Sequence, residues 1–227
     1  MAIDHQIDEQ ADDLIFSALR LFDKAEEFLS ERYALARSNN DRETLEYVLQ
    51  KLVFLHSLRK DYPSAERAYI QWENESQDPS LARSENAFFL FSLARDYTKA
   101  LAKVEEVEKA VEPRVSMHVA SQAEICSLFR VLHVRGRSLL KLGRTSEIAD
   151  LMNHINRLVQ ENPEAQFGFE LDLVEECLGA GLVVDECEVY LQSAHWSSYD
   201  SGVFETRKRE ALKRLDLLRK QSRPGRS

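Results

Sequence analysis

A fifteen-residue segment occurs twice in this chain, at an offset of 35 residues. The segment KLVFLHSLRKDYPSA, residues 51–65, aligns without a gap on NAFFLFSLARDYTKA, residues 86–100. The identical positions are Phe54/Phe89, Leu55/Leu90, Ser57/Ser92, Leu58/Leu93, Asp61/Asp96, Tyr62/Tyr97 and Ala65/Ala100. A period of about 34 residues is typical of stacked helical hairpins, which present a long concave surface. The repeat therefore predicts a helical repeat fold and favours binding over covalent chemistry.

Apolar residues recur at three- and four-residue steps along most of the chain, which is the helical period. Turn and capping residues divide this pattern into segments. The expected helices span residues 12–38, 42–60, 64–76, 81–95, 98–111, 115–142, 145–160, 167–178, 185–194 and 204–218. Pro113 is expected to end the fifth helix, and no alternating strand pattern of useful length occurs. The chain is therefore expected to be all-α.

The organisation expected from these segments has four parts. An N-terminal capping helix falls within residues 1–41, and helical repeats occupy residues 42–196. A C-terminal helix falls within residues 197–222, and residues 223–227 are expected to be a disordered tail.

Charge is distributed unevenly along the chain. The net charge is −9, and residues 203–227 contain nine Lys or Arg and three Asp or Glu, a net of +6, which leaves −15 on residues 1–202. An acidic body argues against general nucleic-acid binding. The basic C-terminal helix either touches an anionic partner, nucleic acid included, or is a solvated last helix with cations near its C-terminal end.

Three features predict a cytoplasmic protein without a membrane partner. The first residues are acidic and lack the apolar core of a signal peptide, and no run approaches the roughly 18 apolar residues of a membrane span. The three cysteines, Cys126, Cys177 and Cys187, are an odd number without the spacing of a disulfide scaffold. These observations together favour a reducing compartment.

The hairpins resemble the tetratricopeptide repeat (TPR). The third hairpin has the most complete pattern, with Leu132, Gly136, Leu139, Leu142, Gly143, Arg144, Ile148, Met152, Ile155 and Pro163. It departs from the pattern at Arg135, where the family carries a leucine, and the step from Ala100 to Ile148 is 48 residues rather than about 34. The resemblance implies a right-handed α-α superhelix with N- and C-terminal capping helices.

In this family the first helix of each hairpin lines the concave groove. Carried over to this chain, the resemblance implies partner-binding residues Tyr47, Gln50, Phe54, Asn86, Phe89, Arg130, His133, Arg137 and Lys141. Phe54 and Phe89 either form hydrophobic pockets in the groove or are core residues.

The last four of these residues follow one face of a single helix, and no Asp or Glu occurs between residues 127 and 146. Such a positive strip predicts recognition of an anion such as an acidic peptide, because arginine forms bidentate hydrogen bonds with carboxylates. The alternatives are a solvated face, or pairing with acids of neighbouring helices such as Glu164 or Glu170.

Candidate chemistry is sparse. Cys177 and Cys187 lie among carboxylates, but the metal-ligand spacing Cys-x-x-Cys is missing and small core residues are the favoured interpretation. Phosphate-loop, zinc-protease and serine-hydrolase motifs do not occur. We therefore expect a non-enzyme without cofactor or metal.

The function expected from the sequence is that of an adaptor, which holds an extended or helical segment of another protein, possibly an acidic one. The alternatives are a structural subunit of a larger assembly and a peptide-sensing regulator. Homo-oligomers are compatible with all three.

Overall fold

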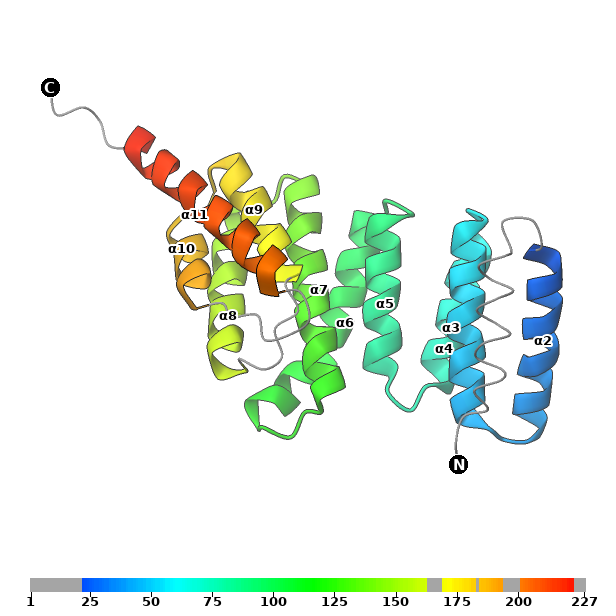
Figure 1. Cartoon of the computed structure of the whole chain (residues 1–227). Coiled ribbons are helices and arrows are strands. Elements are labelled where there is room, and N and C mark those ends of the chain that lie inside the picture. The colour runs from blue at the N-terminus through cyan, green and yellow to red at the C-terminus, as the bar shows by residue number, and fades with distance from the viewer. Residues whose placement is uncertain (1–21, 163–168, 183, 194–200, 223–227) are drawn as a thin grey trace, which may run out of the picture. The chain divides into compact units, whose positions relative to one another are not determined.

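The computed structural model describes residues 22–162, 169–182, 184–193 and 201–222, and within them every regular element is helical (Figure 1). The all-α prediction is therefore confirmed for the described residues. The elements are α2 (Phe22–Ser38), α3 (Arg42–Leu58), α4 (Tyr62–Glu75), α5 (Pro79–Ser92), α6 (Tyr97–Ser116), α7 (Gln122–Lys141), η1 (Thr145–Glu147), α8 (Ile148–Glu161), α9 (Phe169–Ala180), α10 (Val184–Ser193) and α11 (Ser201–Ser222). The expected start of the first helix, residues 12–21, and the expected tail, residues 223–227, lie outside the described residues.

The chain divides into two compact units, residues 1–86 and residues 87–227. In the first unit α3 contacts both α2 and α4. Glu46, near the start of α3, accepts a hydrogen bond from Ser76 at the end of α4, so these two helices run antiparallel. Its core includes Ala25, Leu29, Val48 and Leu55.

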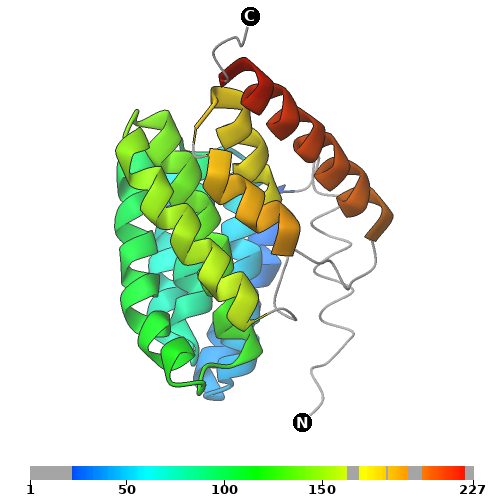
Figure 2. The same cartoon turned by 90° about the vertical axis from the view of Figure 1, so that its left-hand side faces the viewer.

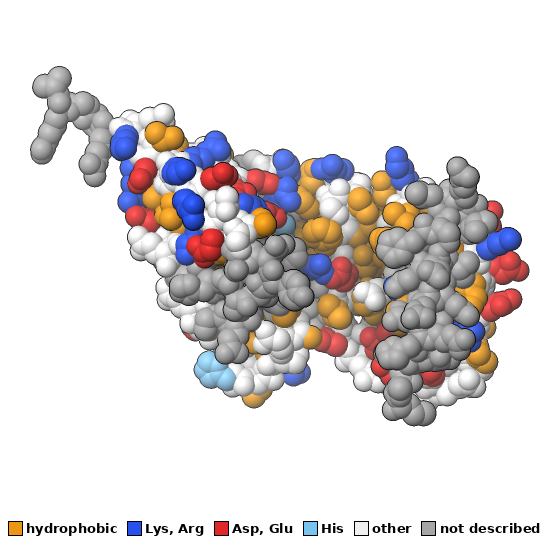
Figure 3. All heavy atoms as spheres, in the orientation of Figure 1, with side chains coloured by type: hydrophobic (Ala, Val, Ile, Leu, Met, Phe, Trp, Pro, Cys, Tyr) orange, Lys and Arg blue, Asp and Glu red, His pale blue; other side chains and the backbone are white. Residues whose placement is uncertain are grey.

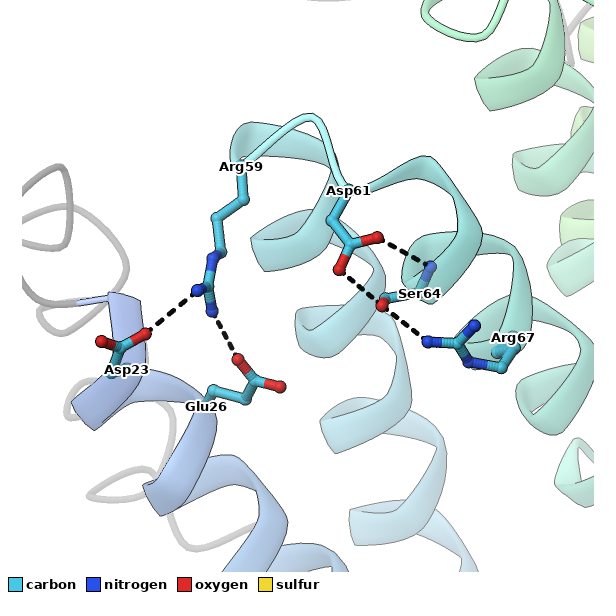
Figure 4. A network of polar contacts seen from close by, with 6 residues as sticks. All are labelled: Asp23, Glu26, Arg59, Asp61, Ser64 and Arg67. Carbon is cyan, nitrogen blue, oxygen red and sulfur yellow. Dashed lines mark hydrogen bonds and ion pairs between the residues drawn. The ribbon is translucent and has the colours of Figure 1, made fainter.

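A cluster of polar contacts joins α2 to the end of α3 (Figure 4). The guanidinium of Arg59 lies 3.0 Å from the carboxylate of Asp23 and 2.5 Å from that of Glu26. Both acids lie near the start of α2, so α2 and α3 are also antiparallel. Asp23 is largely exposed and the other two side chains are partly exposed, and such pairs orient helices more than they stabilise them.

In the second unit alternate helices fall into two layers. One layer holds α7, α9 and α11, in which α9 contacts both of the others. The other layer holds α6, α8 and α10: α8 contacts α10, and His154 of α8 lies 3.4 Å from Glu112 of α6. Figure 2 shows α8 beside α10, with α9 and α11 next to them. Successive helices in the chain thus alternate between the layers.

The internal repeat marks equivalent helix starts. Asp61 caps α4, and its carboxylate accepts a hydrogen bond from the Ser64 amide at 3.2 Å. Asp96 caps α6 in the same way, through the Lys99 amide at 3.1 Å. A side-chain oxygen at this position satisfies one of the free amides of the first turn, which explains why the aspartate recurs.

The repeat also marks equivalent helix ends. Lys60 and Arg95, one repeat apart, both adopt the left-handed conformation, with φ of 60° and 59°. This conformation closes a helix and is most easily adopted by glycine. Left-handed residues also follow other helices, at Asn40, His118, Gly143 and Gly181.

The expectation of one helix over residues 115–142 is wrong. α6 continues through Pro113 to Ser116, and α7 begins only at Gln122. Pro113 costs one backbone hydrogen bond, but the apolar side chains on either side of it, Val111 and Val115, are both buried and hold the last turn in place.

The start of α7 is set by a capping box. The hydroxyl of Ser121 accepts a hydrogen bond from the Glu124 amide, and the Glu124 carboxylate accepts one from the Ser121 amide at 2.8 Å. The sequence Ser-Gln-Ala-Glu carries this signal. The expectation of one continuous helix over residues 115–142 did not take this capping signal into account.

Candidate functional site

Three of the implied groove residues lie on one face of α3. Gln50 is exposed, Tyr47 is half-buried, and 45% of the surface of Phe54 is exposed. Leu58, one turn beyond Phe54, is 42% exposed and extends this face. We call Tyr47, Gln50, Phe54 and Leu58 the α3 surface row.

The local sequence of α3 explains why this row is outside. The opposite side of the helix carries its buried apolar residues, which are Leu45, Val48, Leu49, Val53 and Leu55. α2 and α4 contact α3 on that side, and Tyr47 also packs partly against the core, so Gln50, Phe54 and Leu58 are the exposed members of the row. The ammonium of Lys51 lies 4.9 Å from the centre of the Tyr47 ring, a cation–π distance. Lys51 therefore adds a positive charge next to the row.

The equivalent residues of the second repeat are buried. Phe89 is only 3% exposed, although it matches Phe54 in the repeat. Asn86 is 1% exposed, and its amide lies 3.4 Å from the carboxylate of Glu73. The expectation that Asn86 and Phe89 line an open groove is wrong, and the core interpretation holds for Phe89 but not for Phe54.

The positive strip on α7 is covered by aromatic rings on one side. The guanidinium of Arg130 lies 5.4 Å from the centre of the Phe88 ring, and that of Arg137 lies 5.1 Å from the centre of the Phe91 ring. Both rings belong to the C-terminal half of α5. The arginines thus serve as packing partners of α5.

Carboxylates of α9 meet the same strip. The guanidinium of Arg137 lies 2.5 Å from the carboxylate of Glu176, and Nε2 of His133 lies 4.0 Å from the carboxylate of Asp172. His133 is 1% exposed, so the expectation that its side chain faces a partner is wrong. Of the strip, Lys141 alone is exposed. Glu164 and Glu170, the acids named from sequence, have side chains outside the described set.

The electrostatics of His133 follow from this burial. Loss of water lowers the pKa of its imidazole to about 4, and the positive charge of Arg137 acts in the same direction. Asp172 opposes both effects but does not overcome them. The imidazole is therefore neutral at physiological pH and adds no charge to the strip.

The network continues to α11. The Arg207 guanidinium lies 2.5 Å from the carboxylate of Asp172 and 2.6 Å from that of Glu175. The hydrogen bonds to Glu175 raise the pKa of Arg207 above its ordinary value. Arg137 thus pairs with Glu176, and Arg207 pairs with Asp172 and Glu175. Of the strip, Arg137 is therefore matched by a carboxylate of the same chain.

Sequence reasoning missed Asp172 and Glu176 as partners of the strip. Their spacing of four residues repeats that of His133 and Arg137, which is the only sequence signal for the match. The pairs advance in the same direction along α7 and α9, so these helices run parallel. The matching spacing corresponds to real side-chain pairs only because α7 packs against α9.

A cleft of about 610 Å³ lies along α6 and is lined by charged side chains, including Glu105, Glu108, Glu112 and Arg135. Burial raises the pKa of Glu108, and the Arg135 guanidinium, 3.0 Å away, opposes this rise. Arg135 thus pairs with one of the acidic side chains that line the cleft.

Two of the three cysteines offer little reactivity. Cys177 and Cys187 are free and completely buried, on α9 and α10. A hydrogen bond with the Cys177 thiol and burial both raise the pKa of the Cys187 thiol, which lowers its reactivity. Within the described residues, no group of three or more His, Cys, Asp or Glu could hold a metal ion.

The described helices include none long and apolar enough to cross a membrane. Comparisons with protein-family models, with curated proteins and with solved structures find no match to this chain. Inferences about its function therefore rest on its own residues.

Proposed function

We propose that this chain is a non-catalytic adaptor that binds a segment of another protein on the α3 surface row. The helices would form a TPR-like, right-handed superhelix, in which first helices of hairpins carry the binding residues. A cytoplasmic location suits free, buried cysteines such as Cys177 and Cys187.

The exposure of Phe54 and Leu58 carries the proposal. Single exposed apolar residues are common on protein surfaces. Here two large ones lie one turn apart, with 45% and 42% of their surfaces exposed, and Tyr47 lies two turns before Phe54 on the same side. Covering the exposed part of each side chain would contribute roughly 1 kcal/mol to binding. A row of this kind suits the apolar face of a partner segment.

Lys51 places a positive charge next to the α3 surface row. Its ammonium is held near the Tyr47 ring, so it lies beside the row. The acidic partner expected from the sequence remains part of the proposal, because Lys51 places a positive charge beside the apolar side chains of the row.

The superhelical part of the proposal draws support from the second unit. Its helices alternate between two layers, as stacked hairpins do. Gly136, at a small position of the TPR pattern, lies where α7 meets Leu173 of α9. A Cβ atom there would come within 2.4 Å of the leucine side chain, so the glycine permits close approach.

The non-catalytic part rests on the engagement of the polar groups within the chain. His133 is neutral and enclosed, and Arg137 and Arg207 are engaged with carboxylates. Groups held in this way position helices and do not reach a substrate.

The test is co-purification from native lysate of the chain and of a variant with Phe54→Asp and Leu58→Asp, with partners identified by mass spectrometry. Leu35→Asp is the matched control, because Leu35 on α2 is 51% exposed and lies outside the row. A partner lost with the double variant and kept with the control is the expected result. A partner kept by all three proteins would indicate a structural subunit held by another face and would overturn the assignment of the row.

A further inference from the structure

The basic C-terminal helix is docked on an acidic surface of its own chain. α11 contacts both α9 and α10. In Figure 3, Lys and Arg side chains lie beside Asp and Glu side chains over α11. The excess positive charge of residues 203–227 is thus partly matched by acids of the preceding helices.

Two arginines of α11 make the polar contacts. Arg207 reaches Asp172 and Glu175 of α9, at 2.5 Å and 2.6 Å. Near the other end, Arg219 donates hydrogen bonds to Glu188, one of them at 2.7 Å, and lies 3.3 Å from Asp185. We call the four acids Asp172, Glu175, Asp185 and Glu188 the α9–α10 face.

The two arginines flank an apolar side of α11, because a step of twelve residues turns a helix by about 120°. They are twelve residues apart, which is about 18 Å along a helix. Between and beside them, Phe204, Ala211 and Leu215 are 6%, 4% and 2% exposed. α11 therefore presents an apolar stripe with an arginine near each end, and the α9–α10 face receives both arginines.

The apolar anchoring of α11 is sparse for its length. Among the described side chains of this 22-residue helix, Phe204, Ala211 and Leu215 are the buried apolar ones. α8, with 14 residues, buries Ile148, Leu151, Met152, Ile155, Leu158 and Val159. The ion pairs of α11 are partly exposed to water and are screened by salt. Helices anchored in this way open before the rest of a fold.

We propose that the α9–α10 face is a binding site for basic amphipathic helices, which α11 occupies within the chain and a partner's helix replaces. The partner's helix carries two arginines about three turns apart, with apolar residues between them. The charge complementarity of the face selects it, because carboxylates bind paired guanidinium groups and repel acidic segments. This proposal goes beyond the adaptor function, since it does not involve the α3 surface row.

The test uses the full chain and a fluorescent synthetic peptide with the sequence of residues 201–222. In the wild-type protein α11 competes at high effective concentration, so the peptide binds weakly. In a variant with Arg207→Glu and Arg219→Glu, α11 is repelled from the face. Fluorescence anisotropy is expected to show at least tenfold tighter peptide binding to this variant, weakening as salt is raised.

Two control peptides distinguish recognition by the α9–α10 face from attraction by net charge alone. A peptide with Arg207→Glu and Arg219→Glu is expected not to bind. A peptide with Arg209→Glu and Lys213→Glu changes the charge equally at exposed positions and is expected to bind as before. Equal loss with both peptides would show charge attraction alone and would overturn the proposal.

Circular dichroism tests whether the protein variant with both substitutions is folded. If the double variant is unfolded, the single variant Arg219→Glu is used in its place. Failure of the peptide to bind a folded, open variant would overturn the proposal. A wild-type dimer that the peptide separates would show that a second copy supplies the helix, and would overturn its assignment to another protein.

Discussion

The guanidinium of Arg137 lies 2.5 Å from the carboxylate of Glu176 and so joins α7 to α9 inside the second unit. Both side chains are about 30% exposed, at 28% and 32%. From sequence alone this arginine belongs to a positive strip for an anionic partner. The structure supplies the anion from the same chain.

Removal of either member of this pair is expected to destabilise the protein. Arg137→Ala loses the ion pair and the contact with the Phe91 ring, and we expect the free energy of unfolding to fall by about 2 kcal/mol. A double-mutant cycle with Glu176→Gln, measured by urea denaturation, is expected to give a coupling of about 1 kcal/mol. Lys141→Ala, at an exposed position of the same helix, serves as control, with an expected change below about 0.5 kcal/mol. A coupling near zero would contradict the role given to the pair.

A methyl group at Gly136 is expected to destabilise the protein, although alanine normally favours a helix interior over glycine by about 1 kcal/mol. Its Cβ would lie 2.4 Å from Leu173 and 3.1 Å from Leu151. Both leucines are buried and cannot move freely. Gly136→Ala is therefore expected to lower the free energy of unfolding by about 1–3 kcal/mol, measured by urea denaturation.

Gly179→Ala is the matched control, because its Cβ would meet only Arg214, at an ordinary 3.7 Å. Truncation of the obstructing side chain, Leu173→Ala, in the Gly136→Ala background is expected to cost less than the same truncation in the wild type. If Gly136→Ala is as stable as the wild type, the close approach of α7 and α9 is not as described.

His133 is expected to make stability depend on pH. Its pKa is lowered to about 4 in the folded protein, from about 6.5 in the unfolded chain. Between these values the unfolded chain binds more protons, so stability is fully present above pH 6.5 and is lost as pH falls towards 4. The wild type is expected to lose about 2 kcal/mol from this residue between pH 7 and pH 5.

The measurement compares wild type and His133→Leu by urea denaturation at both pH values. The difference between pH 7 and pH 5 is expected to be smaller in the variant by about 2 kcal/mol. His56 and His154 also have pKa values lowered by burial, so a residual dependence remains in both proteins. An unchanged pH difference would mean that His133 titrates normally.

Glycine at the left-handed helix ends is expected to stabilise the protein. Arg95 has φ of 59°, a conformation that brings the Cβ atom of any residue other than glycine close to its own backbone. Arg95→Gly removes this strain and loses part of the gain to the greater freedom of glycine in the unfolded chain, for a net gain of about 0.5–1 kcal/mol.

Arg95→Ala is the control, since it removes the charge and keeps the Cβ atom, and no gain is expected for it. Lys60→Gly, one repeat earlier, is expected to behave like Arg95→Gly because its φ of 60° is equivalent. The measurement is the midpoint of thermal unfolding of the wild type and of the three variants. Equal midpoints for Arg95→Gly and Arg95→Ala would refute the explanation.

The sequence by itself determined the helices and most of their ends. Asp61 and Asp96 cap the helices that follow them, and these positions were readable because a cap bonds to an amide only three residues away. The helical period is equally local. The boundary within residues 115–142 is also encoded locally, since Ser121 and Glu124 form the capping box at which α7 begins, whereas Pro113 does not end α6.

Only the tertiary structure decided which of these residues face water. Phe54 and Phe89 are identical in the repeat, yet one is 45% exposed and the other 3% exposed. Arg137 belongs to a cationic strip in sequence and to an ion pair in space, because Glu176 approaches from a helix far along the chain. Burial and charge compensation are sums over neighbours distant in sequence, and a local pattern contains no information about which neighbours those are.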